Sequence, residues 1–283
     1  MTKTLLSIGH GYSAKALARI LKPQGWRIIG TTRSAEKADA LIQDGVEACV
    51  YPGSDLSALL SEATHVLSSV SATDTGDPIV ADIGDALAEA KQLEWVGYLS
   101  TTGVYGDFDG AWVNEDTPLS PSTKRGQMRK TAEEDWAAIR GLPLHIFRLA
   151  GIYGPGRGPF SKVRAGTARR IVKPGQVFSR IHVDDIAQVL AASIAARHPG
   201  GIYNVCDDDP APPQDVLSYA AELLGLPEPK EVAFEDAEMG PMARSFYAEN
   251  KRVENTRIKE TLGVTLRYPD YRAGLQAVLK AEG

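Results

Sequence analysis

Short apolar, β-branched segments alternate with amphipathic segments along most of this chain, and no other feature restricts its fold as strongly. Seven of the apolar segments are predicted to be strands, at 4–8, 26–31, 46–50, 65–70, 95–100, 144–148 and 201–205. They are continuously apolar, as strands buried on both faces are, and amphipathic helices are predicted between them, for example at 12–21, 79–93 and 183–196. This alternation predicts an α/β fold with a doubly wound parallel sheet of about seven strands and right-handed crossovers.

Glycine and proline become more frequent after Gly154, where the chain reads GPGRGP at 154–159 and PG at 174–175. We interpret these breaks as excursions into a second, less regular lobe. The sequence therefore predicts a large domain over 1–155 plus 176–205. A smaller C-terminal α/β substrate lobe is predicted over 156–175 plus 206–283, with amphipathic helices at 216–224 and 253–262.

Charge and length exclude several classes of protein. The 283 residues include 31 Lys plus Arg and 36 Asp plus Glu, so a net charge of -5 argues against nucleic acid as the main partner. The longest uncharged stretch, 95–106, has 12 residues, which is too short to cross a membrane. The N-terminus carries no secretory h-region, and the two cysteines, Cys49 and Cys206, form no disulfide framework. We expect a soluble, cytoplasmic protein without a metal site, because the five histidines show no ligand spacing.

A glycine-rich turn follows the first predicted strand and opens the first predicted helix. It reads Gly9-His10-Gly11-Tyr12-Ser13-Ala14, a GxGxxA pattern. In such a turn the first glycine allows a tight bend, and the second lets the backbone approach a pyrophosphate. The small third residue lets the helix pack on the strand while its N-terminal N–H groups face the phosphates. The pattern in this position predicts a Rossmann domain that binds a dinucleotide.

The end of the second predicted strand indicates which dinucleotide is bound. A site for NAD places Asp or Glu there, but this chain has Thr32, Arg33 and Ser34. Arg33 can pair with a 2′-phosphate, assisted by a hydroxyl of Thr32 or Ser34, so NADP is predicted in preference to NAD. The alternative is a solvated arginine at a helix start. Asp55, after the third strand, is a candidate for the adenine edge or an ordinary helix cap.

Four further segments carry a resemblance to a known family. They read LSTTGVYG at 99–106, RLAGIYGPGR at 148–157, IHVDD at 181–185 and YNV at 203–205. In this order the segments resemble the extended short-chain dehydrogenase/reductases, the group of nucleotide-sugar epimerases and dehydratases. The resemblance implies seven parallel strands, a small C-terminal substrate lobe and a site in the crevice between them. It also implies that Thr101 supplies the hydroxyl that orients the substrate.

The chain departs from this family at the YxxxK pair, which supplies the acid and base. The corresponding positions hold Arg125 and Arg129, and a guanidinium cannot exchange protons at neutral pH. Departures of this kind define the members of the superfamily that are called atypical. Helical geometry places Arg125 within about 25° of the centre of an apolar stripe, which is formed by Met128, Ala132, Trp136 and Ile139.

Two guanidinium groups near an apolar helix face need anionic partners. Three interpretations remain open: salt bridges within the protein, an anionic group of the substrate, or exposure to solvent at a frayed helix end. The candidate internal partners are the acidic residues just upstream, Asp107, Asp109, Glu115 and Asp116.

Few residues can replace the missing acid. Tyr105 can donate a proton if it points into the crevice, and otherwise it is a packed loop residue; Tyr153 is a weaker candidate and His182 is expected in the core. The family's phosphate-binding arginine corresponds to Phe178 here, so Arg180 replaces it only with a local shift. Arg157 and Arg180 join Arg125 and Arg129 as candidates for binding the substrate.

Two hypotheses about function follow. The first is an NADP-dependent oxidoreductase or epimerase-like enzyme acting on a polar, possibly anionic sugar-like or carbonyl small molecule, with Thr101 and Tyr105 as catalytic residues. The second is a dinucleotide-binding regulatory or binding protein without hydride transfer. The resemblance also suggests a homodimer through the helices predicted at 79–93 and 123–140.

Overall fold

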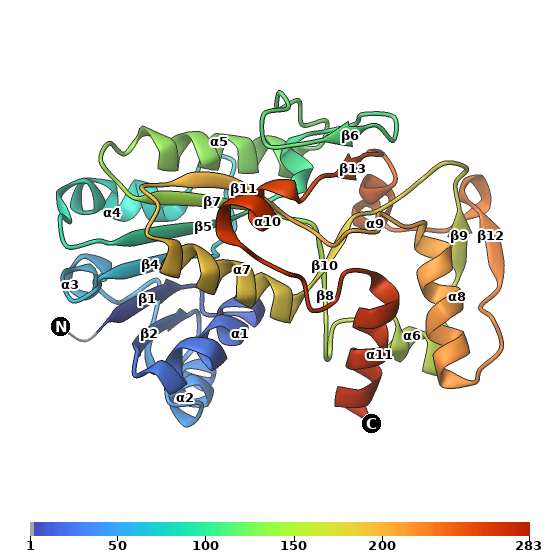
Figure 1. Ribbon diagram of the computed structural model, residues 1–283, viewed down its shortest axis with the longest axis horizontal. Helices are drawn as coiled ribbons and strands as arrows, with labels where there is room; N and C mark the ends of the chain where they lie inside the picture. The colour runs from blue at the N-terminus through green and yellow to red at the C-terminus, as the bar shows by residue number, and fades with distance from the viewer. Residues whose placement is uncertain (1–2) are drawn as a thin grey trace.

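The computed structural model describes residues 3–283 and is built on one seven-stranded parallel sheet (Figure 1). In spatial order the strands are β11 (Gly201–Val205), β7 (Leu144–Leu149), β5 (Trp95–Thr101), β4 (His65–Ser68), β1 (Thr4–Ile8), β2 (Arg27–Thr32) and β3 (Glu47–Val50). All seven predicted strands are confirmed, with ends that differ by at most two residues. The direction of winding reverses between β1 and β4, and such a switch point opens a crevice at the carboxyl ends of the strands.

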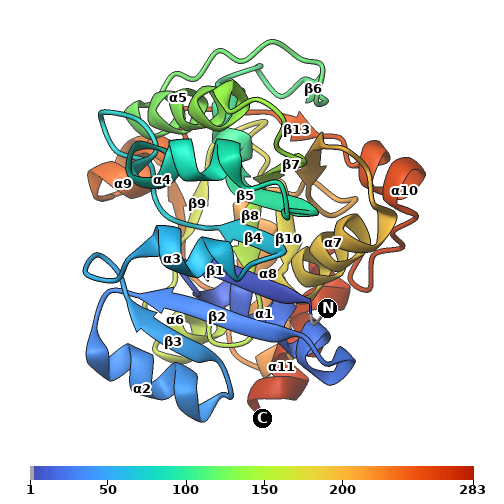
Figure 2. The same ribbon diagram turned by 90° about the vertical axis from the view of Figure 1, so that its left-hand side faces the viewer.

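Helices cover both faces of the sheet, so the predicted doubly wound α/β class is confirmed (Figures 1 and 2). One face carries α1 (Tyr12–Leu21), α2 (Ala35–Gln43) and α7 (Val183–Ala196), and the other carries α3 (Leu56–Ser61), α4 (Pro78–Glu89) and α5 (Lys124–Ala138). The helix predicted at 79–93 ends at Glu89, because the chain leaves the helix at Ala90 and turns so that Leu93 packs into the core.

Side-chain caps set the beginnings of several helices. Asp55 Oδ1 accepts hydrogen bonds from the backbone N–H groups of Ser57 (2.9 Å) and Ala58 (3.2 Å) at the start of α3. Thr123 Oγ1 accepts one from Gly126 N (3.1 Å) and so begins α5 beside the end of β5. The structure therefore gives Asp55 the role of a helix cap, which was one of its two expected roles.

A second, smaller core lies at the right of Figure 1. It is formed by α6 (Phe160–Arg164), α8 (Pro213–Leu224) and α11 (Tyr271–Glu282), with the paired strands β9 (Arg170–Val172) and β12 (Glu231–Ala233) beside them. The short strands β8 (Gly151–Tyr153) and β10 (Arg180–His182) pair in parallel and connect this lobe to the sheet.

The segment from 252 to 266 differs from its prediction. Arg252 and Val253 form β13, which pairs with β6 (Trp112–Val113), so the helix predicted at 253–262 begins only at Thr256 as α10 (Thr256–Leu262). Val253, Ile258 and Val264 pack in the core of the large sheet. This segment therefore leaves the small lobe, to which 206–283 was assigned as a whole.

No helix within residues 3–283 has the length and the apolar content needed to cross a bilayer.

A buried histidine makes the stability of the fold depend on pH. His145 stacks between Trp95 and Tyr203, its Nδ1 pairs with Ser193 Oγ (3.1 Å), and its Nε2 donates to the carbonyl oxygen of His198 (3.2 Å). Burial lowers the pKa of this imidazole from 6.5 to about 4. The unfolded chain therefore binds the proton first, and stability that is complete above pH 6.5 is lost as the pH falls toward 4.

We expect protonation of His145 alone to lower the free energy of unfolding by about 2 kcal/mol between pH 7.5 and pH 5. Urea denaturation of the parent and of His145→Phe at both pH values measures this contribution. The substitution keeps a ring in the stack but removes the ionisation. Between pH 7.5 and pH 5 the variant should therefore lose about 2 kcal/mol less of its free energy of unfolding than the parent. Equal losses in the two proteins would contradict the assignment.

Candidate functional site

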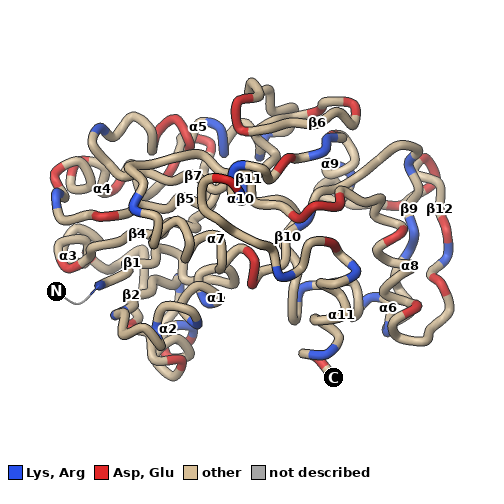
Figure 3. The backbone as a smooth tube through the Cα atoms, in the orientation of Figure 1, with Lys and Arg blue, Asp and Glu red and all other residues tan. Residues whose placement is uncertain are grey.

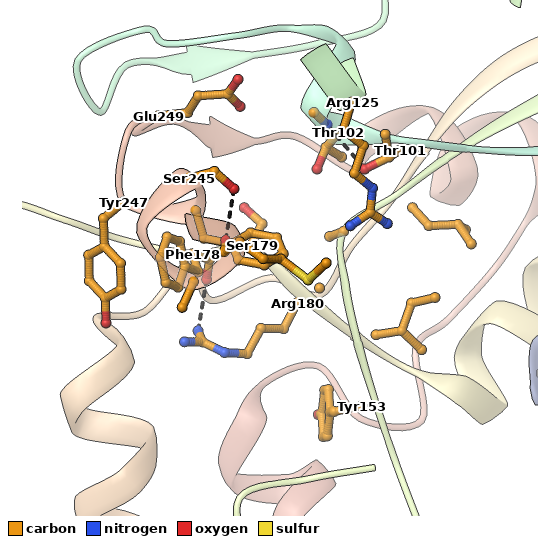
Figure 4. Close-up of a pocket in the computed structure, with 18 of the residues that line it drawn as sticks. Thr101, Thr102, Arg125, Tyr153, Phe178, Ser179, Arg180, Ser245, Tyr247 and Glu249 are labelled. Carbon is orange, nitrogen blue, oxygen red and sulfur yellow. Dashed lines mark hydrogen bonds between the residues drawn. The ribbon is translucent and has the colours of Figure 1, made fainter. Parts of the chain in front are cut away.

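A cleft of about 1260 Å³ opens where the carboxyl ends of the strands face the small lobe (Figure 4). Nine of the predicted site residues line it: Gly9, Gly11, Tyr12, Ser13, Thr101, Arg125, Arg129, Arg157 and Arg180. Six others do not: His10, Ala14, Arg33, Ser34, Asp55 and Tyr105. The cleft therefore brings together the glycine turn, the end of β5 and the start of α5, as predicted.

The glycine turn leaves the N-terminus of α1 open. Gly9 adopts a left-handed conformation (φ +79°), and its N–H donates to Thr31 Oγ1 (2.8 Å), which ties the turn to β2. No side chain caps α1, and a Cβ placed on Gly11 would meet only the carbonyl oxygen of Gly9, at 3.7 Å. The packing of the protein does not require a glycine at position 11, so the missing side chain leaves space for a ligand. Free N–H groups beside that space suit the pyrophosphate of a dinucleotide.

Two residues of the turn are structural. Ala14 is buried against the sheet face, as expected of the third position in the pattern. His10 is buried, with Nδ1 unpaired among the described residues, and burial lowers the pKa of its imidazole to about 4. Its ring lies beside Gly30, where a Cβ would come within 3.0 Å of it, so His10 holds β2 and the turn together as a neutral side chain.

Tyr12 and Arg157 close the same end of the cleft. The Tyr12 hydroxyl donates to the carbonyl oxygen of Pro155 (2.9 Å), and the guanidinium of Arg157 lies 5.8 Å from the centre of the Tyr12 ring. No carboxylate pairs with Arg157 among the described residues. Its position places it with the dinucleotide turn, whereas the sequence suggested a role in substrate binding.

Arg33 and Ser34 follow β2, outside the cleft. Arg33 is exposed and makes no hydrogen bond or ion pair within residues 3–283, whereas Ser34 Oγ caps α2 by accepting from Lys37 N (3.4 Å). An arginine without a protein partner at the end of β2 is compatible with a 2′-phosphate ligand.

Thr101 ends β5 and faces the cleft. Its Oγ1 accepts a hydrogen bond from Gly103 N (3.2 Å), which leaves the hydroxyl proton available to a bound molecule. Figure 4 shows Thr101 and Thr102 beside Arg125, whose side chain extends into the cleft.

The two arginines of α5 have different surroundings. Arg129 Nη1 donates to the Tyr98 hydroxyl (2.8 Å) and to the carbonyl oxygens of Val70 (3.1 Å) and Leu99 (3.2 Å). It ties α5 to the ends of β4 and β5. Arg125, one turn earlier, has no hydrogen-bond or ion-pair partner in the part of the chain that the structure describes.

The proposed salt bridges to the upstream acidic loop are wrong. Asp116 pairs with Arg257 (2.8 Å), and Glu115 lies 3.7 Å from the same guanidinium. Asp107 Oδ1 accepts from the backbone N–H of Asn250 (2.7 Å). The loop therefore packs on the C-terminal segment, which the sequence did not place there, and Arg125 remains available for an anion.

Tyr105 does not face the cleft, which contradicts its candidacy as an acid. Its side chain is 0% exposed, and its hydroxyl donates to Asn204 Oδ1 (2.7 Å) and accepts from Arg148 Nη1 (3.0 Å). Burial raises the pKa of the phenol to about 12. The structure thus supports the alternative of a packed residue, because the 3-10 turn after β5 directs this ring into the core.

Three other candidates have structural partners. Burial raises the pKa of Tyr153, and its hydroxyl lies 3.4 Å from the carbonyl oxygen of Asp270. Buried His182 accepts from Asp184 N (3.1 Å) and begins α7, as expected of a core residue. Arg180 Nη1 donates to the carbonyl oxygens of Phe178 (2.8 Å) and Ala211 (3.0 Å), so its guanidinium joins segments of the small lobe.

The cleft also contains residues that the sequence analysis missed. Ser69 Oγ donates to the carbonyl oxygen of Gly9, and the Lys251–Glu249 pair (2.7 Å) lies at the opposite wall. Ser69 could have been found from the sequence, because it is a serine at the end of an apolar strand next to β1. The segment around Lys251 carried no such sequence signal, because its position depends on the pairing of β13 with β6.

The charge of the cleft differs from that of the whole chain. Its lining holds seven Lys or Arg and two Glu, although charges of both signs are spread over both lobes (Figure 3). A cleft of this charge favours anionic ligands. Among the described residues, no group of three His, Cys, Asp or Glu is arranged to hold a metal ion.

An open glycine turn at the switch point of a parallel sheet, with a hydroxyl at the end of β5, defines a dinucleotide-binding Rossmann protein. Residues 8–206 match the NAD dependent epimerase/dehydratase family, and the chain belongs to it. The resemblance to the extended short-chain dehydrogenase/reductases is thereby confirmed.

Known proteins are similar over nearly the whole chain. A solved structure described as a functionally unknown conserved protein from Silicibacter pomeroyi DSS is 61% identical, with a TM-score of 0.96 and 99% of each chain covered. The solved structure of a putative NAD-dependent epimerase/dehydratase from Methylobacillus flagellatus is 29% identical, with a TM-score of 0.75, over 99% of this chain and 98% of the other. Protein YeeZ of Escherichia coli strain K12 is 28% identical over 282 residues, which is 95% of this chain and 97% of that protein.

Proposed function

We propose that the protein is an NADP(H)-dependent oxidoreductase or epimerase-like enzyme that acts on an anionic carbonyl or sugar-like substrate. The observation that carries this proposal is the presence of Thr101, unpaired Arg125 and the open glycine turn in one cleft. When bound, a reduced nicotinamide supplies a hydride for a carbonyl carbon.

The residues of the cleft have separate roles in this proposal. Thr101 donates its hydroxyl proton as a hydrogen bond to the reacting oxygen and orients it. Arg125 holds the anionic group of the substrate and stabilises negative charge that develops nearby. Arg129 keeps α5 in register with β5 through Leu99 and Tyr98. Because Tyr105 is enclosed in the core, water in the cleft provides the proton that the reacting oxygen takes up.

Arg33 is expected to select NADP. Replacing Arg33 with Asp should weaken NADP binding by about 30-fold to 100-fold, since a charge-assisted bond to the 2′-phosphate is lost and a carboxylate repels it. NAD binding should not fall, because Asp can accept bonds from the ribose hydroxyls. Calorimetry with NADP, NADPH, NAD and NADH measures both effects.

A matched control for Arg33 is Lys37→Asp, which places a carboxylate at an exposed position of α2, the helix that follows Arg33. This control should change NADP affinity by less than about threefold at physiological salt, because exposed charges beyond contact are screened. An Arg33→Asp protein that binds NADP as tightly as the parent would disprove the assignment.

Turnover tests the proposed chemistry. Thr101→Val keeps the shape of the side chain and removes the hydroxyl, so NADPH oxidation with any accepted carbonyl carboxylate should slow by about 100-fold or more. NADP affinity should stay within about twofold of the parent. Undiminished turnover in Thr101→Val would sink this assignment of roles.

One observation favours the second candidate, a dinucleotide-binding protein without hydride transfer. Arg125 and Arg129 occupy the YxxxK positions, and the nearby phenol of Tyr105 is enclosed. A simple assay distinguishes the two candidates. Substrate-dependent oxidation of NADPH that is absent in Thr101→Val supports the enzyme. Tight NADP binding with no such oxidation across a broad panel of carbonyl compounds favours the binding protein.

A further inference from the structure

A short helix, α9 (Pro241–Phe246), contributes an apolar wall to the cleft that also contains Arg125 and Thr101. Building on the proposed function, we propose that the substrate is a carboxylate with an alkyl or aryl body. Its carboxylate binds Arg125 near Thr101, its apolar body lies on α9, and no nucleotide is part of it.

The α9 wall is unusually apolar for an exposed surface. Met242 and Phe246 line the cleft and are 72% and 55% exposed, and they are two of the five large hydrophobic side chains exposed within residues 3–283. Met239 and Ala243 line the same part of the cleft. Exposed apolar side chains that gather at a cleft indicate a ligand that covers them, and methionine adapts well to varied ligand shapes.

The protein itself does not cover these side chains. Neither Met242 nor Phe246 belongs to a hydrophobic cluster of the described chain. The next residue, Tyr247, is covered by the protein: its ring centre lies 5.4 Å from that of Phe178 and 5.3 Å from that of Phe234. One end of α9 is therefore anchored, while the side chains before it remain available to a ligand.

The cations near this wall are already used by the protein. Arg180 donates to Phe178 O and Ala211 O, and Arg169 donates to Ala168 O (2.8 Å). Lys173 donates to Tyr247 O (2.5 Å), and Lys251 pairs with Glu249. A diphosphate at this wall would have to compete with carbonyl or carboxylate oxygens for these guanidinium and ammonium groups.

The free cations lie elsewhere. Of the seven that line the cleft, three have side chains that make no hydrogen bond or ion pair with described residues: Arg125, Arg157 and Lys162. Arg157 lies over Tyr12 at the dinucleotide turn, and Lys162 follows it in α6. Arg125 is therefore the free cation next to Thr101, and Figure 4 shows these two apart from Phe178 and Tyr247. A free cation beside Thr101 and an apolar wall in the same cleft suit a monoanion with an apolar body.

A chain-length series tests the proposal by direct binding. Calorimetry on the whole protein with butanoate, hexanoate and octanoate should show affinity rising about threefold to fourfold per added methylene. Octanamide, which lacks the charge, should bind at least about tenfold more weakly than octanoate. UDP, added with saturating NADP so that the glycine turn is filled, should not displace octanoate.

Matched variants separate the two ends of the site. Met242→Ser combined with Phe246→Ser should weaken octanoate about tenfold and leave butanoate unchanged, whereas Arg125→Gln should weaken both by a similar factor and leave octanamide unchanged. Ile42→Ser, at an exposed apolar residue of α2, and Lys124→Gln, beside Arg125 but paired with Asp74, should change none of these affinities.

Affinity that does not depend on chain length overturns the proposal, as does UDP that displaces octanoate or a double serine variant that binds octanoate like the parent. These outcomes are distinct from failure of the proposed function. If NADP does not bind, the enzyme assignment fails, yet the chain-length series measured without dinucleotide still reports on the α9 wall. If NADP binds but the affinity of the carboxylates does not depend on their chain length, only the proposed substrate class is wrong.

Discussion

Replacing Arg148 with methionine is expected to lower the free energy of unfolding by about 3–5 kcal/mol. Arg148 and Glu133 form an ion pair (2.8 Å) whose side chains are 4% and 5% exposed, and Glu133 also accepts from Ser100 Oγ. Removal of the guanidinium leaves a buried carboxylate without a counter-charge. It also removes a donor to the Tyr105 hydroxyl (3.0 Å). Urea denaturation at pH 7.5 measures the loss.

Two controls show whether burial is the cause. Lys124→Met breaks an exposed pair with Asp74, in which the side chains are 72% and 64% exposed, so it should cost less than about 1 kcal/mol. Arg148→Met combined with Glu133→Leu removes both charges and should recover part of the loss of the single variant. A double variant less stable than Arg148→Met would contradict this account.

Replacing Gly11 with leucine is expected to weaken dinucleotide binding by at least about 100-fold, because the side chain covers the N–H groups of α1 and two charge-assisted bonds are lost. The fold should survive, since φ at Gly11 is -101° and a Cβ there meets only Gly9 O at 3.7 Å. Gly11→Ala should have a smaller effect of the same sign. Calorimetry with NADP and a thermal unfolding curve for each variant give both quantities.

Gly158→Leu is the matched control, because a Cβ at that glycine is equally free, with Gly154 O nearest at 3.9 Å, and the residue lies outside the cleft lining. It should bind NADP like the parent. If Gly11→Leu also bound NADP normally, the dinucleotide could not lie on the N-terminus of α1. The cofactor site would then have to be sought elsewhere.

Local patterns were sufficient for the scaffold. A strand buried on both faces must be apolar throughout, so the ends of the seven strands could be found to within two residues from the apolar segments alone. The glycine turn was equally readable, because the left-handed Gly9 and the open Gly11 are requirements of a few consecutive residues. Thr101 could be placed because the segment LSTTGVYG resembles the corresponding segment of the extended short-chain dehydrogenase/reductases.

Side-chain direction and long-range partners could not be predicted in this way. Tyr105 follows Thr101 by four residues, yet its hydroxyl binds Asn204 and Arg148, so distant β-strands decided where it points. The acidic residues just before α5 were predicted as partners for its arginines because they are close in sequence. They instead bind Arg257 and Asn250, which the chain brings back from the C-terminal segment.

By itself, the sequence determined the sheet and the glycine turn, because each depends on neighbouring residues whose conformational needs are local. A motif of consecutive residues was likewise enough to place the Thr101 hydroxyl. Only the tertiary structure decided that Arg125 is free, that backbone carbonyl oxygens hold Arg129, and that Met242 and Phe246 line the same cleft. Those properties depend on which distant groups satisfy a charge or cover an apolar side chain. They arise only when the whole chain has folded.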